Sequence, residues 1–212
     1  MFTEGEWAAL NATEDANYEE LQMDHNLLEK IDQAFPPLKF ALKKINFKHN
    51  NISKIIKNAF SNLQYVSEID LSYNNLKADA LRPDVFEGRY SPDEYEPIPS
   101  LKVLRLSNNL LHNLDQDVFE HITHLQELYL DNNPFQIIHT SVLNAFSDLP
   151  QLQVLDLTRC ELSELPDDIF HPLRALKTLY MGGNLFKSIP KALKYARNVR
   201  EVVLDENPIE DL

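Results

Sequence analysis

The sequence predicts an α/β solenoid, in which one short unit is repeated and stacked along a single axis. The first observation is the segment that begins at Leu101, LKVLRLSNNLLHNLDQDVF, where a period-two strand pattern gives way to a polar turn and then to irregular apolar spacing. The second is that this pattern recurs eight times along the chain, with an asparagine or a cysteine at the ninth position each time. A single unit cannot bury its own apolar side, so we expect the copies to stack.

The eight units share apolar residues at their first, fourth and sixth positions. They begin at Tyr18, Leu42, Val66, Leu101, Leu125, Leu152, Leu176 and Val199. The ninth positions are Asn26, Asn50, Asn74, Asn109, Asn133, Cys160, Asn184 and Asn207. We therefore expect residues 18–212 to form a single elongated domain of eight repeats, preceded by an N-terminal cap or disordered segment at residues 1–17.

The units resemble leucine-rich repeats, whose signature is L-x-x-L-x-L-x-x-N/C-x-L. The dominant spacing of 24 residues and the late phenylalanine of most units are similar to the typical subclass, which includes Toll receptors, Slit, chaoptin and the small leucine-rich proteoglycans. The resemblance implies a curved horseshoe with a parallel β-sheet on its concave face and irregular, 3-10 or short helical segments on its convex side. It also implies an extracellular or cell-surface location.

The strand of each unit is expected at its third to fifth residues, with the fourth residue pointing inward and the third and fifth pointing outward. Where the backbone leaves the sheet, its N–H and C=O groups need partners, and an asparagine amide offers both a donor and an acceptor. The ninth-position residues are therefore predicted to form a structural ladder. Cys160 is a weaker partner and should give a looser rung.

Two units are longer than the others. The third unit runs for 35 residues, and its extra residues, at about 87–99, are rich in proline, which predicts an insertion loop on the return side. Tyr90 and Tyr95 lie among acidic residues there, in a setting that resembles tyrosine sulfation sites; a plain surface insertion is the alternative. The fifth unit carries a three-residue insertion near residues 140–144.

Charge and composition exclude several classes of function. The net charge of −13 argues against nucleic acid and anionic membranes as partners, whereas it permits a basic protein. The lone cysteine, Cys160, cannot form an intramolecular disulfide. No stretch of about 18 apolar residues predicts a membrane span, and the first residues lack the apolar core of a signal peptide.

No pattern of an enzyme is found. The sequence contains no phosphate-binding glycine loop, no G-x-S-x-G and no H-E-x-x-H, so we predict no catalytic residue, cofactor or metal. His25 and His49 occupy equivalent places beside Asp24, but the nearby Lys48 disfavours a cation between them. Two N-x-S/T sequons make Asn11 and Asn51 candidate glycosylation sites.

The outward positions of the middle and later repeats carry residues typical of protein interfaces, namely aromatic residues, arginine and exposed valine. The predicted protein-binding residues of the concave face are Val103, Arg105, Tyr129, Val154, Arg159 and Tyr180. The alternative is that they are ordinary exposed residues of a solvated sheet.

The sequence thus predicts a non-enzymatic module for protein–protein recognition. With the resemblance, we expect the ligand-binding ectodomain, or a fragment, of a cell-surface or secreted protein in adhesion, signalling or innate immunity, with a protein ligand of unknown identity. One alternative is an intracellular adaptor or scaffold, favoured by the single free cysteine and the lack of a recognisable signal peptide. The other is a regulatory domain of a larger protein.

Overall fold

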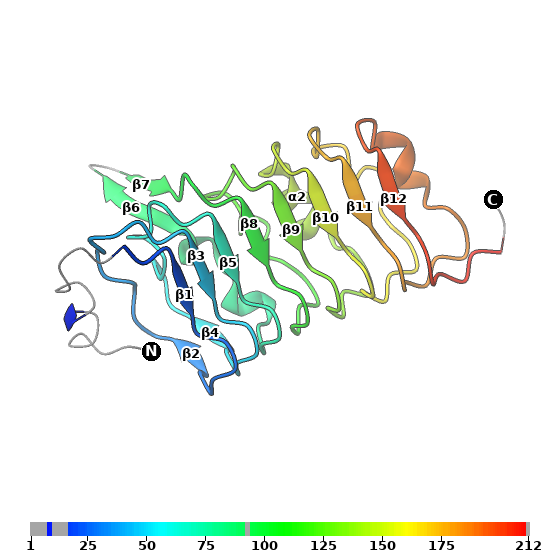
Figure 1. Ribbon diagram of the computed structural model, residues 1–212. Helices are drawn as coiled ribbons and strands as arrows, with labels where there is room; N and C mark the ends of the chain where they lie inside the picture. Colours follow the sequence, from blue (N-terminus) through cyan, green and yellow to red (C-terminus); the bar gives the residue numbers. More distant parts are fainter. Residues whose placement is uncertain (1–7, 10–16, 92–93, 211–212) are drawn as a thin grey trace.

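The structure is a computed structural model of the 212-residue chain, and it describes residues 8–9, 17–91 and 94–210. Figure 1 shows an elongated stack, in which short parallel strands run side by side along one face and return segments occupy the other. Almost all of the predicted cap at residues 1–17, including the sequon at Asn11, lies outside the described residues.

A single parallel sheet runs the length of the stack, and each repeat contributes one strand of three residues. The strands are, in spatial order, β1 (Glu20–Gln22), β3 (Lys44–Asn46), β5 (Glu68–Asp70), β8 (Val103–Arg105), β9 (Glu127–Tyr129), β10 (Val154–Asp156), β11 (Thr178–Tyr180) and β12 (Glu201–Val203). Neighbouring strands pair equal repeat positions, as Leu104 does with Leu128. The predicted α/β solenoid with a parallel sheet is confirmed.

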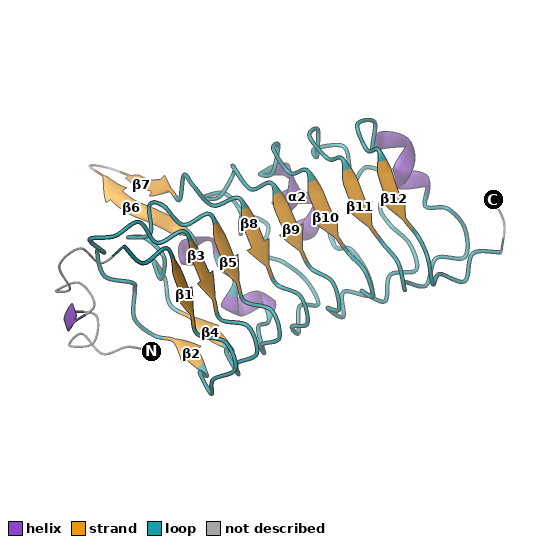
Figure 2. Cartoon of the chain, viewed as in Figure 1, coloured by secondary structure: helices purple, strands orange, loops and turns teal. Residues whose placement is uncertain are grey.

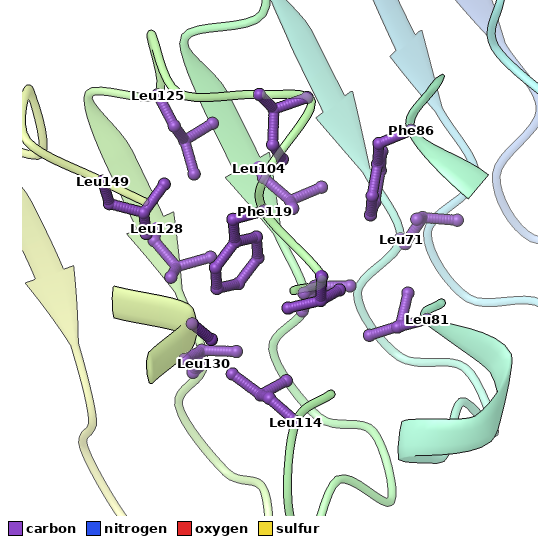
Figure 3. Close-up of a cluster of buried hydrophobic side chains, with 14 of the residues drawn as sticks. Leu71, Leu81, Phe86, Leu104, Leu114, Phe119, Leu125, Leu128, Leu130 and Leu149 are labelled. Atoms are coloured by element: carbon purple, nitrogen blue, oxygen red, sulfur yellow. The ribbon is translucent and has the colours of Figure 1, made fainter. Parts of the chain in front are cut away.

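The core lies between the sheet and the return segments. The central residue of each inner strand, such as Leu104 or Leu128, is fully buried, and the late phenylalanines pack beside them, as Phe119 does in Figure 3. The ring centroids of Phe60 and Phe86 lie 6.0 Å apart in a stacked arrangement. Apolar contact between consecutive repeats therefore holds the stack together.

Ninth-position asparagines bridge consecutive repeats, as Asn109 illustrates. Its Nδ2 donates hydrogen bonds to the carbonyl oxygens of Leu106 in its own repeat and Leu71 in the preceding one, each at 3.0 Å. Its Oδ1 accepts the Leu76 N–H at 3.0 Å. The same bonding pattern recurs at Asn50, Asn74, Asn133, Asn184 and Asn207. Asn26, in the first repeat, donates to the Met23 and Asp24 carbonyls of its own repeat, which are its side-chain bonds within the described part of the chain.

The rung at Cys160 differs because a thiol cannot replace an amide oxygen. The Cys160 Sγ donates to the Leu130 carbonyl at 3.3 Å, but the Phe135 N–H turns instead to the Asn133 carbonyl at 2.9 Å. Gln136, in a left-handed conformation with φ of 61°, then donates its N–H to the Cys160 carbonyl at 3.0 Å. The loop of the fifth repeat therefore adapts to the cysteine of the sixth.

The return side contains several kinds of short element (Figure 2). In the first two repeats, β2 (Lys30–Ile31) and β4 (Lys54–Ile55) pair as a second small parallel sheet, which the sequence analysis did not predict. Short 3-10 helices lie at Ala78–Ala80, Pro83–Val85 and Lys191–Tyr195. The three-residue insertion of the fifth repeat falls in the helix α2 (Thr140–Ser147), which buries Val142, Ala145 and Phe146 against the core.

The long insertion forms an antiparallel β-hairpin rather than an irregular loop. Its strands are β6 (Glu87–Ser91) and β7 (Glu94–Pro97). Pairing lets each strand satisfy the backbone groups of the other, while Pro97 stands at the strand end, where a missing N–H costs little. Ile98 is buried and donates its N–H to the His121 carbonyl at 3.0 Å, which anchors the hairpin to the next repeat.

Candidate functional site

The strand face consists of the side chains at the third and fifth positions of the eight repeats. In β8, β9, β10 and β11 these side chains are half-buried, whereas the central one is fully buried. Five of the six predicted binding residues lie on these four neighbouring strands. They are Val103, Arg105, Tyr129, Val154 and Tyr180.

Arg159 lies outside the strand face, contrary to the prediction. It follows β10 by three residues in a turn where its φ is 53°, and its Nη2 lies 2.7 Å from Glu206 Oε2. Its side chain crosses Gly183, where an added Cβ would come within 2.6 Å of the Arg159 Cγ. The left-handed turn directs the side chain along the rim of the stack, so its sequence proximity to β10 does not place it with the other residues.

Arg105 occupies the centre of a fixed polar arrangement. Its Nε donates to Glu68 Oε1 at 2.9 Å, and its guanidinium carbon lies 4.2 Å from the centroid of the Tyr129 ring. Burial opposes the charge of Arg105, but the bond to Glu68 and the contact with Tyr129 outweigh it and raise its pKa. The Tyr129 hydroxyl donates to Glu127 Oε2 at 2.8 Å, and burial followed by this bond raises the Tyr129 pKa. Both side chains are therefore held in place before any partner arrives.

The beginning of the strand face neutralises its own charges. Lys44 Nζ lies 3.5 Å from Glu68 Oε2 and 3.8 Å from Glu20 Oε1. Together with Arg105, these residues form a row of alternating charges across β1, β3, β5 and β8. Two of the three carboxylates of this half, those of Glu20 and Glu68, are therefore paired with cations. The third, Asp70, accepts the Ser72 N–H at 2.9 Å and has no ion pair among the described residues, but it is in register with Arg105.

Sequence reasoning missed Asp156, which lies in register with Tyr129 on one side and Tyr180 on the other. Its Oδ1 accepts the Thr158 N–H at 2.9 Å, and no ion pair with Asp156 is found in the described part of the chain. Burial, followed by the nearby charge of Asp131, raises the Asp156 pKa despite the Thr158 bond. The available signal was the order of fifth positions, where an acidic residue stands between two tyrosines.

The rim of the first three repeats carries a stack of rings. The centroids of His25 and His49 lie 4.4 Å apart, and those of His49 and Tyr73 lie 4.2 Å apart. Lys48 Nζ lies 5.1 Å from the Tyr73 centroid, and His25 Nδ1 is 2.7 Å from an Asp24 oxygen. The described residues contain no group of three or more potential ligands that could hold a metal ion.

The candidate modification sites occupy exposed positions where they are described. Asn51 is exposed, while the next residue, Ile52, is fully buried. Tyr90 is exposed and pairs across the hairpin with Tyr95, of which only the backbone is described. Within the described residues, no helix has the length and apolar character needed to cross a membrane.

Comparison with known families identifies the repeats. A family profile described as leucine rich repeat matches residues 16–76, 99–162 and 150–209. The chain belongs to the leucine rich repeat family.

Relatives of this family match most of the chain. Keratocan of Gallus gallus is 28% identical over 194 residues, which cover 91% of the chain and 49% of keratocan. Osteomodulin of Bos taurus is 29% identical over 197 residues, covering 92% of the chain and 41% of osteomodulin. Podocan-like protein 1 of Homo sapiens is 29% identical over 202 residues, covering 87% of the chain and 37% of podocan-like protein 1. The chain thus spans about half, or less, of the length of these relatives.

A solved structure also matches the fold. Human 5T4 (Wnt-activated inhibitory factor 1, trophoblast glycoprotein) superposes with a TM-score of 0.69 at 24% identity, over 90% of this chain and 70% of that one. The relatives are leucine-rich repeat proteins of the extracellular, non-enzymatic binding type, which confirms the family and the type predicted from the repeat pattern.

Proposed function

We propose that this chain is a non-enzymatic protein-recognition module that binds its partner through the strand face of β8 to β11. The observation that carries the proposal is the grouping of Arg105, Tyr129 and Tyr180 with two valines on four adjacent strands. Aromatic residues and arginine supply most of the binding energy of protein interfaces, particularly where their side chains are already ordered. The Glu68–Arg105–Tyr129 contacts order two of these three side chains.

The proposed setting is the cell surface or the extracellular matrix, with the chain acting as all or part of a ligand-binding ectodomain. The support comes from the extracellular type of its relatives and from the exposed sequon at Asn51. Mass spectrometry of the protein isolated from its native cells tests this setting. A glycan on Asn51 is the expected result, whereas a protein found only in the cytosol without a glycan would favour an intracellular adaptor.

The binding face is tested by affinity capture with the isolated chain as bait. Replacing Arg105, Tyr129 and Tyr180 together by alanine should abolish capture of the partner that the wild-type chain binds from extracellular fluid. Because all three side chains lie on the outer side of the sheet, the variant should keep its fold, which circular dichroism checks.

A matched control changes the same face elsewhere. Replacing Gln22 and Asn46, at fifth positions of β1 and β3, by alanine should leave capture unchanged. Capture that survives the triple replacement would move the binding site away from β8 to β11 and contradict the proposal.

A further inference from the structure

Asp156 is a half-buried anion near the middle of the strand face. Its carboxylate accepts the Thr158 N–H but has no cation partner in the described part of the chain. The charge of Asp131, which is also negative, acts on this carboxylate and contributes to raising its pKa. Within the described residues, Asp131 accepts side-chain hydrogen bonds from two neutral donors, Ser107 and Asn132. Folding therefore leaves a negative charge on this part of the face that a positive group would stabilise.

Two tyrosines flank this carboxylate. Tyr129 on β9 and Tyr180 on β11 are both in register with Asp156 on β10, so all three side chains leave the sheet on the same side. Neighbouring strands lie about 4.8 Å apart, which places the two tyrosines about 10 Å apart with the carboxylate between them. That space suits one flat cationic group. The Tyr180 hydroxyl has no hydrogen bond to any other described residue.

Arg105 indicates which cation suits such a site. On the same face, its guanidinium lies over the Tyr129 ring and donates to the Glu68 carboxylate. A guanidinium can stack on an aromatic ring and pair with a carboxylate at the same time, because it is planar and its N–H groups point outward in the plane. Asp156 has the carboxylate and the aromatic neighbours of this arrangement, but it lacks the guanidinium.

We propose that the partner of this module inserts an arginine side chain between Tyr129 and Tyr180, with its guanidinium paired to the Asp156 carboxylate. The net charge of −13 also favours a basic partner surface by long-range attraction. This inference rests on the proposed function, since it names the chemistry that the strand face recognises. Binding converts an unpaired anion into an ion pair shielded by two rings, so Asp156 and the partner's arginine should be strongly coupled.

A random peptide library displayed on phage and selected on the whole immobilised chain supplies the probes. The selected peptides should share an arginine. Replacing that arginine by citrulline, which keeps its shape and removes its charge, should weaken binding to the wild-type chain at least tenfold. On the Asp156→Asn variant the same replacement should change the affinity less than twofold, because the carboxylate that pairs with the guanidinium has been removed.

The controls use the same face and the same peptides. Glu20→Gln removes a carboxylate of the same face that is already paired with Lys44 and lies on β1, away from β9 to β11, so the preference for arginine should persist. Exchanging the peptide's arginine for lysine should also weaken binding, since an ammonium group is not planar and cannot lie flat against the face of a ring while it pairs with the carboxylate. Equal binding by the lysine peptide would overturn the assignment of an arginine.

Asp156→Asn keeps the size of the side chain and an acceptor for the Thr158 N–H, so it should fold. Should it fail to fold, Tyr180→Leu tests the same site by removing one of its walls, and it should likewise reduce the citrulline effect.

Two further outcomes separate this inference from the proposed function. Peptides that lose binding on the triple alanine variant but share no arginine, or whose arginine matters equally on Asp156→Asn, would overturn the inference and leave the proposed function standing. Peptides that bind the triple variant as well as the wild-type chain, or a selection that returns no binders, would count against both.

Discussion

The two halves of the strand face differ in how they treat charge. Across β1 to β8, the carboxylates of Glu20 and Glu68 are paired with Lys44 and Arg105. Across β9 to β11, Asp156 has no cation partner among the described residues and lies between two tyrosines. Asp70 on β5 also has no ion pair among the described residues, but it is in register with Arg105 rather than with two tyrosines. Repeats with the same backbone thus place cations beside the carboxylates of one half and aromatic rings beside the Asp156 carboxylate of the other. From this difference we expect recognition to depend on the carboxylate that the fold leaves without a cation, and not on the curvature of the stack alone.

The largest expected effect comes from breaking the core that both halves share. Leu106→Ala should lower the free energy of unfolding by about 2–5 kcal/mol, because Leu106 is fully buried and the cavity cannot close completely. Chemical denaturation followed by circular dichroism measures it. A loss below about 0.5 kcal/mol would contradict the packing described and, with it, the idea that both halves stand on one stack.

The ladder rungs beneath the two halves offer a smaller contrast. Asn109→Ala should cost about 1–3 kcal/mol, because it leaves the buried Leu76 N–H without its acceptor and removes one of the two asparagine donors to each of the Leu71 and Leu106 carbonyls. Cys160→Ala should cost less than Asn109→Ala, since the thiol makes weak bonds and the fifth repeat has already redirected the Phe135 N–H. Equal losses in a denaturation series would show that the two rungs contribute alike.

Removing the charge of Asp156 should leave the free energy of unfolding unchanged or raise it. The pKa of Asp156 is raised by burial, so the ionised carboxylate disfavours the folded state above the ordinary aspartate pKa of 3.8, and this penalty disappears as the pH falls below that value. Asp156→Asn should therefore be at least as stable as the wild-type chain at pH 7, with the difference vanishing near pH 3. In contrast, Lys44→Ala should lower the free energy of unfolding by about 0–1 kcal/mol at pH 7, because it removes one partner of an exposed ion pair. Chemical denaturation at the two pH values measures both effects.

The smallest expected effect concerns the reactivity of Cys160, in the half of the molecule that carries β9 to β11. Cys160 is fully buried beneath β10, and burial raises the pKa of its thiol to about 12. We expect no reaction with iodoacetamide at pH 8 in the folded chain and rapid reaction in denaturant, because the thiol is both neutral and covered. Rapid labelling of the native chain would show that the second half opens readily and is a poor platform for a fixed binding site.

Much of the fold was predictable because the repeat leaves little choice. Every repeat must bury its apolar fourth and sixth residues and bridge to its neighbour through its ninth residue. Only one alignment of the repeats meets both conditions, and Leu104, Leu106 and Asn109 occupy the places that this alignment requires. The hairpin at Glu87–Pro97 and the small sheet of β2 and β4 were not predicted, because each depends on pairing between segments rather than on a local pattern.

The binding face was predictable only in part. The outward alternation places Arg105, Tyr129 and Tyr180 on adjacent strands, but the left-handed turn that removes Arg159 from the face leaves no clear mark on a single residue. Asp156 is distinguished by its two tyrosine neighbours and by the lack of a cation partner among the described residues, and both properties depend on the folded structure. Which carboxylates are paired depends on side chains 24 or more residues away, and periodicity does not report that.

Site-specific photo-crosslinking tests the central claim most directly, namely that the second half of the strand face holds the partner. A photoreactive phenylalanine analogue at position 180, on β11, should crosslink to the captured partner, while the same analogue at position 46, on β3, should not. Both positions are the fifth of their repeats and are half-buried on the same face, so they differ in location and not in exposure. Crosslinking from position 46 in preference to position 180 would contradict the account.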